Sequence, residues 1–192
     1  NPSGRTADTF LTDLTANPTW NNFGNFEYDN VKEFEVDSAR GVRFPHFVNY
    51  NEGIYVGYRY YETAADEGLI DYDSVVQYPF GYGLSYTSFD EKMGSVAYDT
   101  ESGTISFDVT VTNTGDVAGK DVVEVYCNPP YTNGGIEKAS ANLVSFEKTK
   151  ELEPGESETV SIEFDDDDMA SYDYRNAKSY VLESGDYRIS VR

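Results

Sequence analysis

The second half of the chain is a series of short segments in which apolar and polar residues alternate. The clearest one runs from Ile105 to Val111, where Ile, Phe and two Val residues alternate with Ser, Asp and Thr. A period of two places the apolar side chains on one face of a strand, whereas a helix needs apolar residues three and four positions apart. This alternation restricts the fold most, because it predicts strands that bury one face against a second layer.

The same alternation predicts further strands along the chain. Three of them are DVVEVYC with Val123, Val125 and Cys127 on one face, ETVSIEF with Val160, Ile162 and Phe164, and YRISV with Tyr187, Ile189 and Val191. Weaker strands are predicted in SVAY, NLVSF and SYVL. The turn sequences between them are Ser102-Gly103, Thr114-Gly115-Asp116, Pro154-Gly155 and Ser184-Gly185.

About seven short strands in about 95 residues, without a long helix, predict an antiparallel β-sandwich of immunoglobulin or fibronectin type. We place this domain at residues 91–192, with one core. We expect the inward-facing residues to be Phe107, Val109, Val111, Val123, Val125, Val160, Ile162, Tyr187 and Ile189.

Residues 1–90 lack such a pattern. Their first thirty residues are rich in turn formers and supply few elements that could cover one another, so we interpret this region as part of a domain. The segment EGIYVGYRYYETAADEG predicts a short helix with Ile54, Tyr58 and Tyr61 on one face and Gly68 at its end. A strand through IYVGYRYY is the alternative, since tyrosine and valine favour strands.

The stretch QYPFGYGLSYTSF, residues 77–89, concentrates aromatic residues but is interrupted by a proline and two glycines. A continuous helix or plain strand is therefore excluded. We expect Tyr78, Phe80, Tyr82 and Tyr86 to fill a seam between two bodies. Gly81 and Gly83 would let the backbone turn where a Cβ would clash.

Composition excludes several classes of protein. The net charge of −21, from 35 acidic and 14 basic residues, argues against a nucleic-acid partner. No apolar run approaches the roughly 20 residues that cross a bilayer. Cys127 is the single cysteine, so an internal disulfide is impossible, and its place in a strand predicts a buried, unreactive thiol. Cysteine usage leaves the cellular compartment undecided, and the start at Asn1 predicts a fragment or a processed product.

Six segments in order carry a resemblance to a known family. NPSGR, YNEGIYVGYRYYET and YPFGYGLSYTSF resemble the end of the α/β sandwich domain of glycoside hydrolase family 3, the β-glucosidase family. VTVTNTGDVAGKDVVEVY, LVSFEKTKELEPGESETVSIEF and the terminal MASYD with ESGDYRISV resemble its fibronectin type III-like domain. The sequence after NPSGR is similar to that of family members with a permuted domain order, so the domain order of a parent enzyme stays open.

The resemblance implies a division into 1–90, the C-terminal part of an α/β sandwich domain with a linker, and 91–192, a fibronectin type III-like domain. Retaining glycosidases use two carboxyl groups about 5–5.5 Å apart. In this family the nucleophile is an aspartate of the barrel domain and the acid/base is a glutamate upstream of the segment present here. The chain is thus expected to hold no catalytic, cofactor or metal residue. Its expected partners are the remaining catalytic domains and, through them, a β-glucoside or oligosaccharide.

Several residues resemble site residues, but structural roles are favoured for them. Glu52, near Arg59, could have a pKa raised by its aromatic neighbours, but a helix cap or an ion pair with Arg59 is favoured. The run Asp165–Asp168 could bind calcium, but it lacks the spacing of a calcium loop, and a helix cap through Asp168 is favoured. His46 is the single histidine, which argues against a multi-histidine metal site and a Ser-His-Asp triad.

Exposed aromatic residues leave a second function open. Trp20, Tyr131 and the tyrosines of YVGYRYY could stack against sugar rings, although aromatics in this number more often form cores and interfaces. The leading hypothesis is a non-catalytic part of a β-glucosidase-type hydrolase that braces the catalytic domains and shapes the rim of their cleft. The alternative is a free-standing carbohydrate-binding or adhesive β-sandwich.

Overall fold

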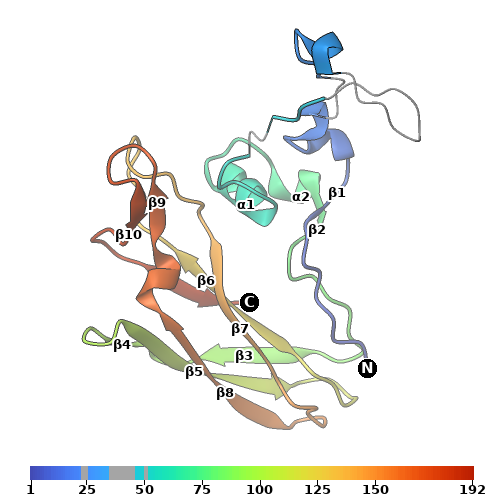
Figure 1. The fold of residues 1–192 in the computed structure, drawn as a ribbon. Helices are drawn as coiled ribbons and strands as arrows, with labels where there is room; N and C mark the ends of the chain where they lie inside the picture. Colours follow the sequence, from blue (N-terminus) through green and yellow to red (C-terminus); the bar gives the residue numbers. More distant parts are fainter. Residues whose placement is uncertain (23–25, 35–45, 50–51) are drawn as a thin grey trace.

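The computed structural model describes residues 1–22, 26–34, 46–49 and 52–192 (Figure 1). Residues 89–192, called the sandwich below, contain a sheet centred on β5 (Thr104–Asn113). β8 (Ser157–Asp165) pairs antiparallel with β5 along nearly all of its length. The opposite edge of β5 pairs with β3 (Phe89–Met93) at one end and with β4 (Ala97–Asp99) at the other.

The second sheet of the sandwich has the antiparallel order β11-β6-β7. Its strands are Arg188–Val191, Val122–Asn128 and Asn142–Lys148, respectively. A separate ribbon joins β9 (Ser171–Asp173) to β10 (Ser179–Val181), and it follows the 3-10 helix η4 (Asp166–Met169). The prediction of a mainly β, antiparallel sandwich is confirmed.

The core lies between the two large sheets and follows the predicted alternation. Along β5 the buried apolar residues are Ile105, Phe107, Val109 and Val111, and they belong to one cluster with Val123 and Val125 of β6. The alternating apolar residues of β8 are also buried: Val160, Ile162 and Phe164 belong to the same cluster. Ile189 packs against this cluster, whereas Tyr187 is half-buried and is not among the cluster's residues, so its assignment to the core is wrong.

Two sets of apolar residues in this core were not predicted from the sequence. Leu152 is fully buried although it lies in the irregular segment between β7 and β8, flanked by glutamates. β3 was assigned no strand, yet its Phe89 and Met93 pack against the core. The boundary between 90 and 91 stays a prediction, and the first strand of the sandwich begins two residues before it.

Residues 1–88, called the N-terminal region below, hold short elements. β1 (Phe10–Leu11) pairs antiparallel with β2 (Val76–Tyr78), and α1 (Tyr58–Asp66) precedes the one-turn helix α2 (Tyr72–Val75). Three 3-10 turns complete the described part: η1 (Leu14–Ala16), η2 (Trp20–Asn22) and η3 (Val31–Phe34). Within the described ranges, every helix is too short or too polar to span a lipid bilayer.

The predicted helix is present, but it is shorter than expected. α1 begins at Tyr58, so Ile54 lies before it and is 38% exposed, which corrects its assignment to the helix face. Tyr61 is in the helix and buried, and Gly68 follows the helix, as predicted, with a φ of +70°, a conformation that favours glycine. Tyr50 and Asn51 of the same motif lie outside the described residues.

Candidate functional site

The most elaborate polar arrangement lies along the seam between the N-terminal region and the sandwich. Residues 1–6 run beside residues 79–88, and the two segments exchange backbone hydrogen bonds between Thr6, Gly81 and Tyr82. Figure 1 shows this pair of segments descending from the helical part to the edge of the sandwich near β3. The first residues of the chain are thereby held against the turn that precedes β6 and the end of β7.

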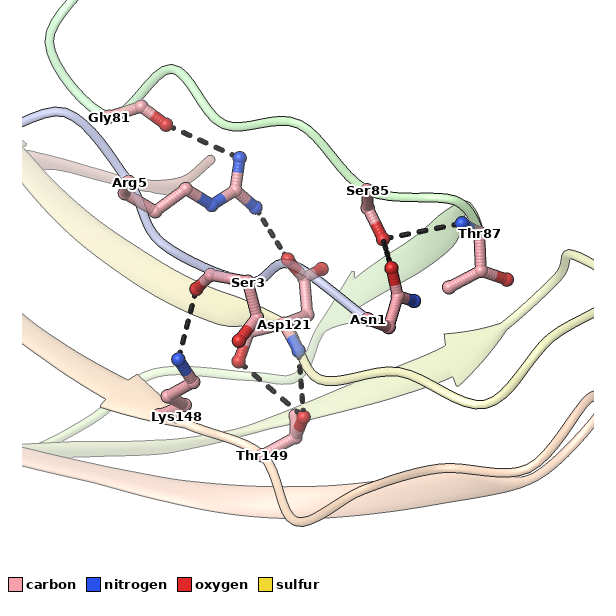
Figure 2. Close-up of polar contacts among 9 residues, drawn as sticks. All are labelled: Asn1, Ser3, Arg5, Gly81, Ser85, Thr87, Asp121, Lys148 and Thr149. Carbon is pink, nitrogen blue, oxygen red and sulfur yellow. Dashed lines mark hydrogen bonds and ion pairs between the residues drawn. The ribbon is translucent and has the colours of Figure 1, made fainter.

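Side chains fix this segment to the sandwich (Figure 2). The Asn1 amide donates to the carbonyl of Ala118 at 3.0 Å, and the Lys148 ammonium donates to the carbonyl of Ser3 at 2.9 Å. The Arg5 guanidinium forms an ion pair with Asp121 and donates to the carbonyl of Gly81. The polar residues of the NPSGR motif therefore serve as an attachment to the second body.

Thr149 supports the carboxylate that receives Arg5. The backbone NH of Asp121 donates to the Thr149 hydroxyl at 2.9 Å, and the backbone NH of Thr149 donates to the Asp121 carbonyl at 3.0 Å. Both residues are buried. This reciprocal pair fixes the backbone of Asp121, so Arg5 meets a carboxylate on a rigid support.

A second attachment joins α1 to the last strand. The Arg192 guanidinium binds the Glu62 carboxylate through two hydrogen bonds, 2.7 and 2.9 Å, and lies 4.4 Å from the centre of the Tyr126 ring. Its bond to Glu62 raises the pKa of Arg192. The Tyr126 hydroxyl donates to Glu124 at 2.7 Å, and burial, with that hydrogen bond, raises the pKa of this phenol.

The helix also binds the sandwich through neutral groups. The backbone NH of Leu143 donates to the Tyr58 hydroxyl at 2.8 Å, and the backbone NH of Ser140 donates to the Thr63 hydroxyl at 2.9 Å. Because Ser140 belongs to the loop before β7 and Leu143 to β7 itself, α1 covers the outer face of the second sheet. β6 is consequently buried on both faces, with Val123 and Val125 inward and Glu124 and Tyr126 toward α1.

The aromatic stretch at residues 77–89 forms part of this seam, as predicted for Phe80. Its ring lies 4.6 Å from that of Tyr58, which in turn meets Tyr126 edge-on at 6.0 Å. The rings of Tyr78 and Tyr82 pack against each other in a tilted arrangement with 4.8 Å between their centres, and Tyr78 contacts Phe10 within the N-terminal region. Tyr86 is 82% exposed, so the prediction that it fills the seam is wrong.

The two glycines of this stretch are required for close approach. Gly81 has a φ of +78°, and a Cβ there would overlap the carboxylate of Glu124. A Cβ at Gly83 would lie 2.8 Å from the carbonyl oxygen of Gly4 and 2.9 Å from Cδ of Arg5. The expectation that these glycines occur where a Cβ would clash is confirmed.

A cavity of about 620 Å³ opens along the seam. Its walls combine aromatic and apolar side chains with paired charges, and they include Tyr72, Phe80, Tyr82, Glu62, Asp66 and Arg192. The lining charges at Glu62 and Arg192 bind each other, and Arg5 is held by Asp121. The cavity therefore lies where the N-terminal region joins the sandwich, and most of its charged side chains form ion pairs between these two regions.

One acidic residue at the seam, Glu91, had no predicted role. Glu91 lies on β3, and one of its carboxyl oxygens is buried without a hydrogen-bond partner in the described part of the chain. Burial, together with the nearby Asp121, raises the pKa of Glu91 to about 7, while Arg5 opposes the shift. In the sequence FDEKM this residue is indistinguishable from the solvent-facing acids around it.

The residue weighed as a catalyst lies elsewhere. Glu52 borders a second cavity, of about 470 Å³, together with Tyr55, Tyr60 and Tyr61. It caps no helix, because α1 begins six residues later, and the ion pairs of the described residues include none between Glu52 and Arg59. Both roles favoured for Glu52 are therefore wrong.

The aspartate run and the cysteine follow their structural predictions. Asp165 is the N-cap of η4, and the Asp168 carboxylate accepts the backbone NH of Asp165 at 3.2 Å, which forms a capping box. Among the described residues, no group of three or more His, Cys, Asp and Glu side chains could hold a metal ion. Cys127 is buried, and burial raises the pKa of its thiol to about 11.

The remaining candidates are dispersed over the surface. His46 is exposed and forms an isolated antiparallel bridge with Glu27. Trp20 and Tyr131 are each 47% exposed, one in η2 and the other in the loop after β6. These aromatic residues thus belong to different regions and do not share an element.

Comparisons with known proteins agree with this architecture. Residues 121–192 match the model of the fibronectin type III-like domain. The chain is 39% identical to a probable β-glucosidase K of Emericella nidulans over 191 residues, covering 100% of this chain and 19% of the relative. The curated relatives that match are far longer, and this chain spans 17–22% of the length of the first five.

Solved structures give the same result. A β-glucosidase from Paenibacillus barengoltzii superposes with a TM-score of 0.77 at 36% identity, covering 99% of this chain and 18% of the other. A GH3 β-glucosidase from Bifidobacterium adolescentis superposes with a TM-score of 0.74 at 30% identity, covering 98% and 23%. At these identities the likeness extends over both the N-terminal region and the sandwich.

Proposed function

The chain is homologous to a part of glycoside hydrolase family 3 β-glucosidases that includes their fibronectin type III-like domain, and we propose that it is a non-catalytic part of such an enzyme. In this role it braces the catalytic domains and shapes the rim of their cleft. Residues 1–90 are the end of an α/β sandwich domain, and residues 91–192 are the fibronectin type III-like domain. The nucleophile and the acid/base belong to other parts of the parent enzyme.

The observation that carries this proposal is the uncovered apolar surface of the N-terminal region. Phe10, Leu14 and Val56 are 51%, 65% and 59% exposed, and all three border the 470 Å³ cavity. β1 has two residues and β2 has three, whereas an isolated two-stranded sheet is at best marginally stable in water. Exposed apolar surface beside such a sheet is typical of an interface.

The length of the relatives indicates what covers this surface. About four-fifths of each relative lies outside the segment that matches this chain. Other parts of the N-terminal region are already attached to the sandwich through Arg5 and Arg192. The remaining domains of the parent enzyme are the occupant we propose for the open side.

The test uses the parent enzyme expressed as two parts, this chain and the remaining domains. We expect binding between the parts, and hydrolysis of p-nitrophenyl β-glucoside that increases when both are mixed. Leu14→Asp should weaken both effects at least about tenfold, because a charge at an apolar contact loses its hydration. Phe146→Asp is the matched control, since Phe146 is 66% exposed on the sandwich. Equal effects of the two variants, or no binding, would contradict the proposal.

The alternative function is a free-standing carbohydrate-binding sandwich. On the ribbon of β9 and β10, Tyr172 pairs with Tyr180, and Tyr174 follows directly after β9. These three tyrosines are 45%, 72% and 55% exposed, respectively. Exposed aromatic side chains of this kind can stack against sugar rings. Titration calorimetry of this chain with cellobiose and longer glucans decides between the two: saturable binding that Tyr180→Ala removes would favour the alternative.

A further inference from the structure

A cavity of about 570 Å³ is bordered by β4 and by the loop that joins β10 to β11. Figure 1 shows these two elements at the same end of the sandwich. The floor of the cavity is the end of the hydrophobic core, because Ile105 belongs to the core cluster and Met169 and Ile189 pack against it. Cavities of roughly 300–1,000 Å³ are the usual size for small ligands.

Apolar side chains continue from this floor to the surface of the molecule. Val96, Tyr98 and Leu182 line the cavity and are 45%, 52% and 39% exposed. Tyr187, which is half-buried, lines it as well. An apolar group that enters the cavity is therefore removed from water against a continuous apolar surface, which favours its binding.

Hydrogen bonds and an ion pair hold the walls of the cavity in place. The Tyr98 hydroxyl donates to the Asp166 carboxylate at 2.7 Å, which ties β4 to η4. The Tyr187 hydroxyl donates to the carbonyl of Glu183 at 3.1 Å, and the Glu183 carboxylate pairs with the buried Lys138. The cavity is thus largely formed before a ligand enters, and this lowers the cost of binding.

The charged residues that line the cavity are all acidic. They are Asp166, Glu183 and Asp186, and the lining formed by the described residues contains no lysine, arginine or histidine. Lys138 neutralises Glu183, whereas Asp166 and Asp186 form no ion pair with any residue that the structure describes. The whole chain has a net charge of −21. Both the rim and the net charge therefore attract a cation and repel an anion.

We propose that this cavity binds a small organic cation, in which an ammonium group is joined to an apolar body the size of an aromatic ring. The apolar body lies on the floor, against Ile105, Met169 and Leu182. The ammonium group stays at the rim beside the exposed Asp186, where water still reaches it, so its charge is not buried. The ring of Tyr98 offers the cation a further favourable contact. The inference does not rest on the proposed function.

Three compounds of similar shape test the choice of ligand. 2-Phenylethylammonium, 2-phenylethanol and 3-phenylpropionate share an apolar body and differ in charge. Backbone amide NMR of the whole chain should show saturable shifts with the cation at residues 96–98, 166–169 and 182–187. The cation should bind at least about fivefold more tightly than the alcohol, because each exposed pair of opposite charges contributes up to about that factor. The anion should show no saturable binding.

Two variants separate the contribution of charge from that of apolar contact. Asp186→Asn should weaken binding of the cation about two- to fivefold and leave the alcohol unchanged. Leu182→Ala should weaken both compounds at least about twofold, because it removes apolar surface from the cavity. Asp90→Asn is the matched control for charge and should change neither affinity. Asp90 is an exposed acid on β3, which pairs with the opposite end of β5 from β4.

Equal affinities of the three compounds would overturn the inference. So would shifts confined to other parts of the chain, or equal effects of Asp186→Asn and Asp90→Asn. Shifts of the same amides when the chain is concentrated without a ligand would also overturn it, because a second copy of the chain would then occupy the cavity.

Discussion

The sandwich and the N-terminal region bury their apolar residues to very different extents. Val109, Val111, Val123 and Val125 of the sandwich are completely inaccessible to solvent. In the described part of the N-terminal region the buried apolar residues are Val31, Tyr61, Ala64 and Val76, and they form no cluster with one another in the way that the sandwich core does. One region therefore carries its own core, whereas the other depends on surfaces supplied by its neighbours.

The largest difference expected concerns activity. Since the resemblance places both catalytic carboxyl groups outside the chain, this chain alone should hydrolyse p-nitrophenyl β-glucoside no faster than buffer does. Loss of members of a catalytic unit typically costs several orders of magnitude in rate. The assay compares the isolated chain with the intact parent enzyme. Turnover by the chain alone, removed by Glu52→Gln, would make Glu52 the leading catalyst and refute the division of roles.

A core substitution should separate the stabilities of the two regions. Ile162→Ala removes a side chain that is 2% exposed in the centre of the sandwich, and should cost about 2–5 kcal/mol of unfolding free energy. Val76→Ala in the N-terminal region should shift the same denaturant transition by less than Ile162→Ala does, because that region has no core cluster of its own in its described part. A loss below half a kcal/mol for Ile162→Ala would show that the core is assigned wrongly.

The regions should also differ in hydrogen exchange. Amides of residues 1–75 should be about 100-fold less protected on average than those of β5, β6 and β8, because local opening there exposes little buried surface. Peptide-level exchange by mass spectrometry measures this in a dilute monomer. Uniform strong protection across both regions would contradict the comparison.

The sequence allowed the sandwich to be predicted well because its information is local. Alternation places Phe107 or Ile162 on the inner face whatever lies opposite, so the strands and most of the core are confirmed. The burial of Leu152 was not predicted because it lies on an irregular segment, where apolar and polar residues do not alternate. The inward position of Glu91 was not predicted because an acidic residue in a strand is normally assigned to the solvent-facing side.

The seam could be predicted only in outline. Phe80, Gly81 and Gly83 were expected there from the density of aromatics and the need for a turn. Two ion pairs, Arg5 with Asp121 and Glu62 with Arg192, join residues that are 116 and 130 positions apart. The local sequence around each residue does not indicate its partner. Pairings of this kind depend on the final packing of two bodies, which a local pattern does not encode.

The smallest effect expected tests the close packing between the two regions at a single atom. Gly81→Ala adds a Cβ at a φ of +78°, and this Cβ overlaps the Glu124 carboxylate, so it imposes both backbone strain and a collision across the seam. Gly155→Ala is matched in φ, also +78°, but its Cβ meets nothing within 4 Å. Denaturant melts should show that Gly81→Ala costs about 1 kcal/mol more than Gly155→Ala, because both variants have the backbone strain and only Gly81→Ala has the collision.

Hydrogen-exchange protection of residues 1–9 should fall only in Gly81→Ala. Equal costs for the two variants, with unchanged protection, would mean that Gly81 is required for its φ alone and that the N-terminal region does not approach β6 as closely as the structure has it.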